Sequence, residues 1–333
     1  MKVLRLLFLC LLQFSCNSQI DEKINGISFV ASRDKVTQEH IDPVINVKAN
    51  YAAVMPFGFI RSLSEPNVVF NTDRQWFGET RTGAKQYTQL LKKNGIKVMI
   101  KPQLWVWRGE FTGAIKMESE EAWQKLEKTY EDFILTYAKL AQEVNAAVYC
   151  IGTELEAFVK NRPEFWKQLI VKVKSIYSGK LTYAANWDEY IRTPFWAELD
   201  YIGVDAYFPL SEAKNPTKTQ MSKGWQKWKM QLETISKKKN KPILFTEFGY
   251  RSMDYTAKKP WLVDRGEMNV NLSAQAEATQ VVFDEFWKED WFAGGFIWKW
   301  FIKHEKSGGT DDNRFTPQNK PAEDVIRNNY GDY

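Results

Sequence analysis

Residues 146–154, AAVYCIGTE, form a short apolar run that ends in Thr153 and Glu154. Residues 242–248, PILFTEF, show the same ending further along the chain, where Thr246 is followed by Glu247. Short runs that are apolar on both faces are typical of strands buried in a parallel sheet. Removing a carboxylate from water at such a strand end is costly unless the group has a role. The two stretches therefore predict buried parallel strands, each presenting a glutamate at its carboxyl end.

Similar runs recur along the chain and predict further strands. They are GISFV (26–30), YAAVMPF (51–57), KVMIKP (97–102), LTYAA (181–185), YIGVDAY (201–207) and GGFIWKW (294–300). Helix-like stretches lie between most of these runs, at 83–95, 120–145, 164–179, 224–240 and 273–290. Parallel strands need such crossovers, and eight repeats fit a (β/α)8 barrel of ~250 residues plus insertions.

The fold class predicted is therefore α/β, a single (β/α)8 TIM barrel over residues 25–333. A doubly wound open sheet is the alternative. It is disfavoured because no glycine-rich phosphate loop follows the first run.

The first residues have the pattern of a secretory signal. Two cations, Lys2 and Arg5, precede an apolar core that is too short to cross a bilayer and that ends at Ser15-Cys16. Cleavage before Cys16 would leave that cysteine to carry a lipid. We therefore expect a signal peptide over 1–15, a tether over 16–24 and an exported, membrane-anchored lipoprotein, with plain secretion as the alternative.

Composition narrows the functional classes. The signal removes two of the positive charges, so the net charge falls from +5 to +3, and without a basic stripe we expect no nucleic-acid partner. Cys150 is then the only thiol besides the anchor, and His40 and His304 occur in no zinc-binding pattern, so we expect no metal and no cofactor. The 14 Trp, 14 Tyr and 21 Phe allow stacking platforms for sugar rings, or simply a large aromatic core.

The two glutamates suggest a reaction. In a barrel the carboxyl ends of all strands converge on one bowl, and the fourth and seventh strands, which carry Glu154 and Glu247, face each other across it. Two opposed carboxylates are the working groups of glycoside hydrolysis, one as acid and one as nucleophile or base. A metal site would need more ligands than these strand ends supply.

IGTELE (151–156) and FTEFGY (245–250) resemble the pattern of glycoside hydrolase clan A, and most closely family 113, the β-mannanases. The resemblance extends to KVMIKPQLWV (97–106), YIGVDAYFPL (201–210), GGFIWKW (294–300) and FTPQNKPAEDVI (315–326). It implies that Glu154 is the acid/base and Glu247 the nucleophile of a retaining enzyme that cleaves internal β-1,4 links of mannan-type polysaccharides. Much of the clan has Asn before the acid/base, where this chain has Thr153.

Several residues near the strand ends are candidates for substrate binding. Trp298 resembles the aromatic platform of the clan, and Trp105 and Trp107 alternate, so at most one of them points into the cleft while the other packs. Asn186 and Trp187 follow the strand at 181–185, at the barrel mouth.

Other residues are expected to support the glutamates. Lys101 lies in an apolar strand end, where an ammonium needs a partner: a sugar hydroxyl, a carboxylate or a structural salt bridge. Tyr207 is a further candidate for substrate binding, and it could also donate a hydrogen bond to Glu247. Thr153, Asp205 and Arg251 are expected in supporting roles, Arg251 near Glu247 and Asp205 to orient its neighbours.

Alternatives remain at this level. One is a β-glycanase acting on another glucan or an oligosaccharide, and another is a non-catalytic, surface glycan-binding lipoprotein. A binder has no need for two desolvated carboxylates, which favours the enzyme. Glu156 lies further into the loop, where a favourable charge near the following helix or a subsite contact is expected.

Overall fold

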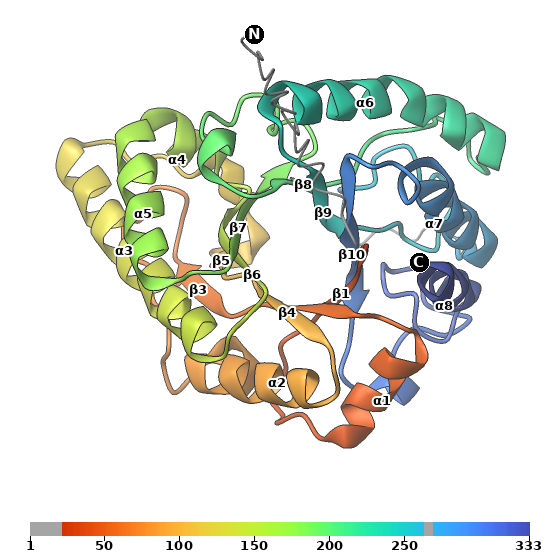
Figure 1. Ribbon diagram of the computed structural model, residues 1–333, viewed down its shortest axis with the longest axis horizontal. Coiled ribbons are helices and arrows are strands. Elements are labelled where there is room, and N and C mark those ends of the chain that lie inside the picture. Colours follow the sequence, from red (N-terminus) through yellow and green to blue (C-terminus); the bar gives the residue numbers. More distant parts are fainter. Residues whose placement is uncertain (1–21, 263–268) are drawn as a thin grey trace, which may run out of the picture.

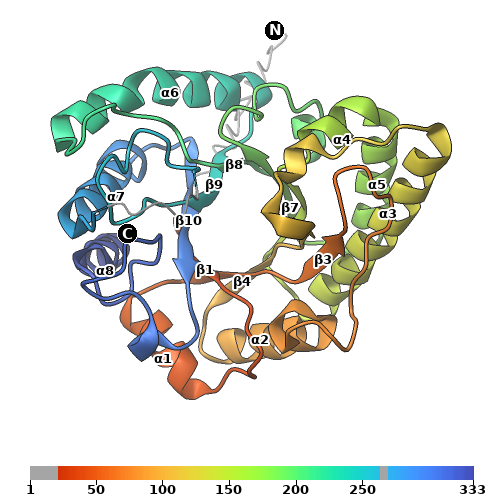
Figure 2. The same cartoon turned by 180° about the vertical axis from the view of Figure 1, so that it is seen from behind.

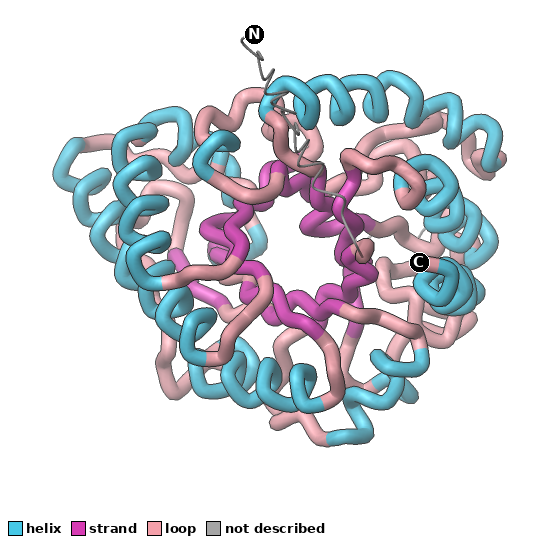
Figure 3. Tube along the Cα trace, viewed as in Figure 1, coloured by secondary structure: helices cyan, strands magenta, loops and turns pink. Residues whose placement is uncertain are grey.

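The computed structural model describes residues 22–262 and 269–333, and it confirms the predicted (β/α)8 barrel. Eight parallel strands close in the order β1-β10-β9-β8-β7-β6-β4-β2 (Figures 1 and 3). The barrel strands are β1 (Ile24–Phe29), β2 (Tyr51–Val54), β4 (Lys97–Ile100), β6 (Val148–Thr153), β7 (Lys180–Asn186), β8 (Ile202–Asp205), β9 (Ile243–Phe248) and β10 (Phe292–Trp300).

Helices surround this ring of strands (Figure 3). They are α1 (Gln38–Asn46), α2 (Arg81–Lys93), α3 (Glu120–Glu143), α4 (Glu156–Asn161), α5 (Pro163–Ile176), α6 (Lys218–Lys239), α7 (Leu272–Phe286) and α8 (Pro321–Asp332). Thr80, Ser119 and Thr217 cap α2, α3 and α6, because each hydroxyl accepts a hydrogen bond from a backbone N–H of the first turn. The connection from β7 to β8 departs from the pattern, with only the 3₁₀ helix Trp196–Glu198 in place of an α-helix.

Side chains fill the barrel itself. One cluster of small or medium apolar residues comes from nearly every strand: Ile24, Ala53, Met99, Val148, Cys150, Ala184, Leu244, Ala293 and Phe296. A larger, aromatic-rich layer packs between the strands and the helices and includes the fully buried Trp166, Trp225 and Trp287. The interior of the barrel is therefore a packed core.

A second, two-stranded sheet extends one side of the mouth. β3 (Phe57–Ile60) and β5 (Gln103–Val106) pair in parallel directly after β2 and β4. In the view from behind, β3 and α4 lie toward the reader beside the ring of strands (Figure 2). This extension carries Gln103 and Trp105 to the carboxyl ends of the barrel strands.

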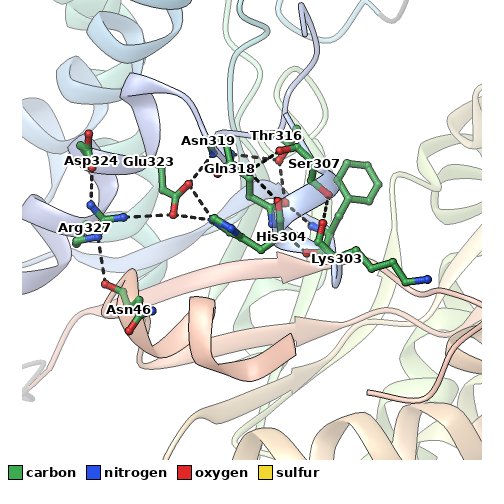
Figure 4. Close-up of polar contacts among 11 residues, drawn as sticks. Asn46, Lys303, His304, Ser307, Thr316, Gln318, Asn319, Glu323, Asp324 and Arg327 are labelled. Atoms are coloured by element: carbon green, nitrogen blue, oxygen red, sulfur yellow. Dashed lines mark hydrogen bonds and ion pairs between the residues drawn. The ribbon is translucent and has the colours of Figure 1, made fainter. Parts of the chain in front are cut away.

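Polar contacts tie the chain after β10 to the last helix (Figure 4). The side chain of Gln318 accepts from the backbone N–H of Phe301 at 2.7 Å and donates to its carbonyl at 3.0 Å. His304 Nε2 lies 2.9 Å from Glu323, which also contacts Arg327 at 3.3 Å, and Arg327 donates to the carbonyl of Asn46 at 3.2 Å. The end of β10 is thereby anchored to α8 and, through it, to α1.

The amino-terminal prediction can be followed only in part. The predicted signal peptide and Cys16 lie outside the described residues. Lys23, in the predicted tether, donates to the carbonyls of Glu289 and Phe292 at 2.7 and 2.5 Å, and β1 begins at Ile24. The last residues of the tether thus already pack on the barrel. Within 22–262 and 269–333, no helix combines the length and the apolar character needed to span a membrane.

The seam between β1 and β10 depends on Gly294. Its φ is +121°, and a Cβ there would lie 2.3 Å from the carbonyl oxygen of Ile24 on the neighbouring strand. Gly309 also has a positive φ, +90°, but nothing lies within 4 Å of its Cβ position. An alanine would therefore be strained at both positions, but it would collide with neighbouring backbone only at Gly294.

We predict that Gly294→Ala lowers the free energy of unfolding by about 3 kcal/mol or more, because strain and a backbone collision combine. Gly309→Ala should lower it by only about 1 kcal/mol, from strain alone. Urea denaturation followed by tryptophan fluorescence measures both. Equal losses would show that the barrel seam relaxes freely around a methyl group.

Candidate active site

Glu154 and Glu247 meet at one pocket in the mouth of the barrel. Glu154 directly follows β6, and Glu247 is the second-to-last residue of β9. We call this cavity the mouth pocket; its lining includes Gln103, Trp105, Phe111, Thr153, Glu154, Glu247, Trp298 and Lys299. The structure thus brings the two predicted glutamates together, together with the predicted residues Thr153, Trp105 and Trp298.

Three donors surround the carboxylate of Glu247, which is almost fully buried. Its Oε1 accepts from Lys101 Nζ at 2.5 Å and from Gln103 Nε2 at 2.9 Å. Its Oε2 accepts from the hydroxyl of Tyr207 at 2.8 Å, the contact that the sequence suggested. These bonds compensate for the lost hydration of the carboxylate and hold it in one orientation.

Lys101 lies beneath the mouth pocket, with its ammonium fully buried. It contacts Glu247 at 2.5 Å and Asp205 at 3.2 Å. Burial lowers the pKa of Lys101, but the charges of Asp205 and Glu247 raise it by more, so that the net pKa is above its usual value. Its partners are therefore carboxylates, one of the alternatives left open above, and it is not among the residues that line the mouth pocket.

Asp205 completes this buried cluster from the end of β8. Its Oδ1 also accepts from the hydroxyl of Thr246 at 2.8 Å, and the residue is fully buried. Burial and the charge of Glu247 raise the pKa of Asp205 to about 7, against the opposing effects of Lys101 and Thr246. Asp205 contacts Lys101 and Thr246 and does not line the mouth pocket, as expected for a residue that orients its neighbours.

Glu154 has an unusual backbone conformation. Its φ is +51°, in the left-handed region that residues other than glycine rarely adopt. Its N–H donates to the carbonyl of Ala184 at 2.8 Å, and its carbonyl accepts from the hydroxyl of Thr112 at 3.1 Å. These contacts stabilise a sharp turn out of β6 into α4, and strain of this kind is characteristic of functional sites.

The environment of the Glu154 carboxyl differs from that of Glu247. Burial raises the pKa of Glu154 well above its usual value, and the charges of Asp205 and Glu247 raise it further, while Lys101 opposes them. One carboxyl group is thus favoured in its protonated form, while the other accepts three hydrogen bonds. Paired carboxyls in contrasting environments can divide the roles of acid and nucleophile.

Thr153 leaves a polar atom without a partner at the pocket wall. Its hydroxyl is buried beside the thiol of Cys150 and has no hydrogen-bond partner of normal geometry in the described part of the chain. Buried hydroxyls are rarely left unsatisfied, so this oxygen is available to a group that enters the pocket.

The aromatic candidates separate in the structure. Trp105 and Trp298 line the mouth pocket. Trp107 was expected to pack if Trp105 faced the cleft, but 67% of it is exposed, so that part of the expectation is corrected. Trp107 follows β5 at the start of a short 3₁₀ turn, where strand alternation no longer sets the side-chain direction.

Asn186, Trp187 and Arg251 are not among the residues that line the mouth pocket. The Asn186 side chain accepts from the backbone N–H of Trp187 at 2.9 Å, and Trp187 stacks on Trp261 with ring centroids 4.9 Å apart. Arg251 Nε donates to the carbonyl of Asn313 at 3.3 Å. Lys101 supplies the cation beside Glu247 that the sequence had suggested from Arg251.

Glu156 occupies the first position of α4 and is not equivalent to Glu154. Its carboxylate pairs with Arg192 Nε at 2.5 Å, and both side chains are substantially exposed. An acidic residue in the first turn of a helix is favourable, in agreement with the first of the two expected roles.

Several residues of the pocket were missed from the sequence, among them Gln103 and Lys299. Gln103 lies two positions after Lys101, so strand alternation could have placed both on the same side. Lys299 had no such signal, because it adjoins Trp298 and would be expected to face the other way. Its ammonium lies 5.5 Å from the Trp298 ring and 5.0 Å from the Phe301 ring, and burial lowers its pKa against the opposing charge of Glu247.

A closed (β/α)8 barrel with paired glutamates after the fourth and seventh strands is the architecture of a glycoside hydrolase. The sequence matches Glycoside Hydrolase Family 113 over residues 31–320, and the chain belongs to this family. A search of curated proteins finds no match.

Solved structures give the same fold. The GH113 beta-mannanase AaManA from Alicyclobacillus acidocaldarius, in complex with ManMIm, superposes with a TM-score of 0.81 at 23% identity, over 95% of this chain and 99% of its own. A GH113 beta-1,4-mannanase superposes with a TM-score of 0.81 at 23% identity, over 94% of this chain and 100% of its own. A beta-glucuronidase from Faecalibacterium prausnitzii gives 0.62 at 14%, over 93% of this chain but 49% of its own.

We predict that Lys101→Met lowers the free energy of unfolding by about 3–5 kcal/mol, because it leaves two buried carboxylates without their cation. Lys97→Met is the matched control on the same strand. Lys97 pairs with Glu22 at 2.6 Å at the exposed end of β4, and such surface pairs contribute about 1 kcal/mol or less. Urea denaturation of both variants makes the comparison, and similar losses would contradict a structural role for the buried cluster.

Proposed function

We propose that this glycoside hydrolase cleaves internal β-1,4-mannosidic links of mannan-type polysaccharides by double displacement, with retention of configuration. The observation that supports it most directly is the pairing of Glu154 and Glu247 in one pocket, with a raised pKa at the first and a web of donors at the second. Glu154 is the acid/base and Glu247 the nucleophile.

In the first step, the carboxylate of Glu247 attacks the anomeric carbon of the sugar that occupies the mouth pocket. The bond to the leaving oxygen breaks while Glu154 transfers its proton to that oxygen. Lys101, Gln103 and Tyr207 fix the attacking oxygens, so the nucleophile needs little reorganisation. The products are a glycosyl ester on Glu247 and a shortened glycan.

In the second step, water attacks the same carbon. The ionised Glu154 removes the proton of the water, the ester bond breaks, and Glu247 leaves as a carboxylate. Two inversions at one carbon give net retention. The enzyme returns to its starting protonation state without any other reactant.

Mannan is proposed as the substrate because the chain belongs to family 113 and because the structural matches include two enzymes described as mannanases. The mouth pocket offers Trp105, Phe111 and Trp298 as apolar surfaces for sugar rings, and Lys299 and Thr153 as polar groups for hydroxyls. A β-glycanase acting on another glucan, and a non-catalytic glycan binder, are the competing functions.

The purified mature protein should release reducing ends from mannan or glucomannan, and far fewer from xylan or cellulose. Release chiefly from cellulose or xylan would replace mannan by another backbone. Binding to these polysaccharides without release from any of them would favour the glycan binder.

Substitutions of the three glutamates test the assigned roles. We predict that Glu247→Ala lowers kcat by roughly 10⁴-fold or more on every substrate, and Glu154→Ala by about 10²–10⁴-fold on mannan. Glu156→Ala is the control and should change kcat only slightly, because its carboxylate contacts Arg192. Full activity in either Glu154→Ala or Glu247→Ala would overturn the assignment.

Azide provides an independent test of the roles and of retention. With an activated aryl glycoside, azide should restore Glu154→Ala and give a product with the configuration of the substrate. With Glu247→Ala, it should give the inverted glycosyl azide, because it replaces the nucleophile. The opposite assignment of products would exchange the two roles.

We further propose that the protein is exported and anchored through a lipid on Cys16. In a bacterial host that processes lipoproteins, the full chain should fractionate with membranes, and Cys16→Ser should move it to the soluble fraction. Soluble wild-type protein that begins near residue 16 would favour plain secretion.

A further inference from the structure

A relay of hydrogen bonds reaches the backbone beside Glu154 from β7. The N–H of Leu155 donates to the hydroxyl of Tyr183 at 2.7 Å, and this hydroxyl donates to Oε1 of Glu189 at 2.7 Å. Oε2 of Glu189 accepts from the backbone N–H of Asn186 at 3.1 Å. Leu155, Tyr183 and Glu189 are all buried, with Glu189 only 2% exposed. A buried carboxylate is therefore connected to the residue that follows Glu154.

This relay acts where the backbone needs support. Glu154 has a φ of +51°, and such a conformation persists only where its surroundings enforce it. Ala184 holds the N–H of Glu154 and Thr112 holds its carbonyl. The Tyr183 hydroxyl holds the next N–H along the chain, that of Leu155, and Glu189 orients this hydroxyl by accepting a hydrogen bond from it.

The carboxyl group of Glu189 also affects the pKa of Glu154. Burial raises the pKa of Glu189 to about 7, Tyr183 and Asn186 oppose this, and Glu156 and Asp205 add to it. The charge of Glu189 in turn contributes to the raised pKa of Glu154, after burial, Asp205 and Glu247.

We propose that Glu189 is a positioning residue for the general acid Glu154: through Tyr183 it fixes the backbone that carries the acid, and its carboxylate adds a negative charge near that acid. The proposal rests on the function proposed above, in which Glu154 donates the proton. Glu189 itself touches neither substrate nor reacting atoms.

The charged and titratable groups around the two residues set the direction of the effect. Glu189 faces Tyr183 of β7, Glu156 of α4, Asp205 of β8 and Arg192 of its own loop. Glu154 faces Asp205, Glu247, Lys101 and Glu189. As the pH rises through about 7, Glu189 ionises and opposes ionisation of Glu154. Glu154 therefore keeps its proton further into the alkaline range, and activity persists there.

The test is the pH dependence of kcat/KM for full-length Glu189→Gln, with mannohexaose as the substrate. Removing the charge should let Glu154 lose its proton at lower pH, so the alkaline limb should move down by about half to one pH unit. Glu156→Gln is the matched control. It also removes a glutamate of this region, but its charge acts on Glu189 and is not among those that raise the pKa of Glu154, so its alkaline limb should move much less than that of Glu189→Gln.

A comparison of leaving groups separates positioning from general damage. Tyr183→Phe and Glu189→Gln should lower kcat/KM on mannohexaose by about tenfold or more, since its leaving group needs the proton. Both should lower kcat/KM much less on dinitrophenyl β-mannobioside, because kcat/KM reports the first step and its leaving group needs no proton. A merely structural defect would lower both rates alike. If Glu189→Gln fails to fold, Tyr183→Phe, which keeps the charge of Glu189, carries the leaving-group comparison.

An unshifted alkaline limb in folded Glu189→Gln, or equal losses on both substrates, would overturn the proposal. Failure of the underlying function looks different. In that case wild-type protein would not hydrolyse mannohexaose, or Glu154→Ala would remain fully active, whatever the behaviour of Glu189→Gln.

Discussion

The ammonium of Lys101, held inside the barrel between Glu247 and Asp205, is the interaction on which the site depends. Burying three ionisable groups costs several kcal/mol for each charge, and only close contact between them compensates. Lys101 directly follows β4, Asp205 ends β8 and Glu247 lies in β9, so the three residues meet only if the barrel closes in register. The apolar layer beneath them supplies the stability that allows such a cluster at the mouth. Fold and site are therefore coupled: the barrel brings the charges together, and the charges tolerate no slip of its strands.

The same cluster gives two chemically identical side chains different properties. Glu247 is surrounded by donors from Lys101, Gln103 and Tyr207. Glu154 has the negative charges of Asp205 and Glu247 nearby, and Lys101 opposes their effect on its pKa. Burial and these neighbouring charges thus favour a proton on Glu154, whereas the carboxylate of Glu247 is held by three hydrogen-bond donors. Glu154 has a left-handed backbone conformation, and the hydrogen bonds from Leu155 through Tyr183 to Glu189 support the chain beside it.

Much of this could be predicted from the sequence, for local reasons. Strands buried on both faces are continuous apolar runs, so all eight barrel strands could be located from such runs in the sequence. The repeated Thr-Glu endings identified Glu154 and Glu247, because a carboxylate after a buried strand is conspicuous. Prediction was weaker wherever the backbone leaves the strand. Trp107 points to solvent because β5 ends in a tight turn, and Arg251 bonds Asn313 across the loops. Side chains do not alternate between two faces in such segments, and the separation of two residues in the sequence does not predict whether they are in contact.

The sequence by itself determined the strands and helices, their order and the positions of the two glutamates at strand ends. Buried strands and the polar residues that end them can be recognised from short runs of neighbouring residues. Only the tertiary structure decided which groups surround those glutamates. Lys101 and Gln103, just after β4, and Tyr207, just after β8, converge on Glu247, and Tyr183 and Glu189 converge on the backbone beside Glu154. Protonation depends on distances of a few ångströms between residues far apart in the chain. Those distances exist only once the barrel has closed.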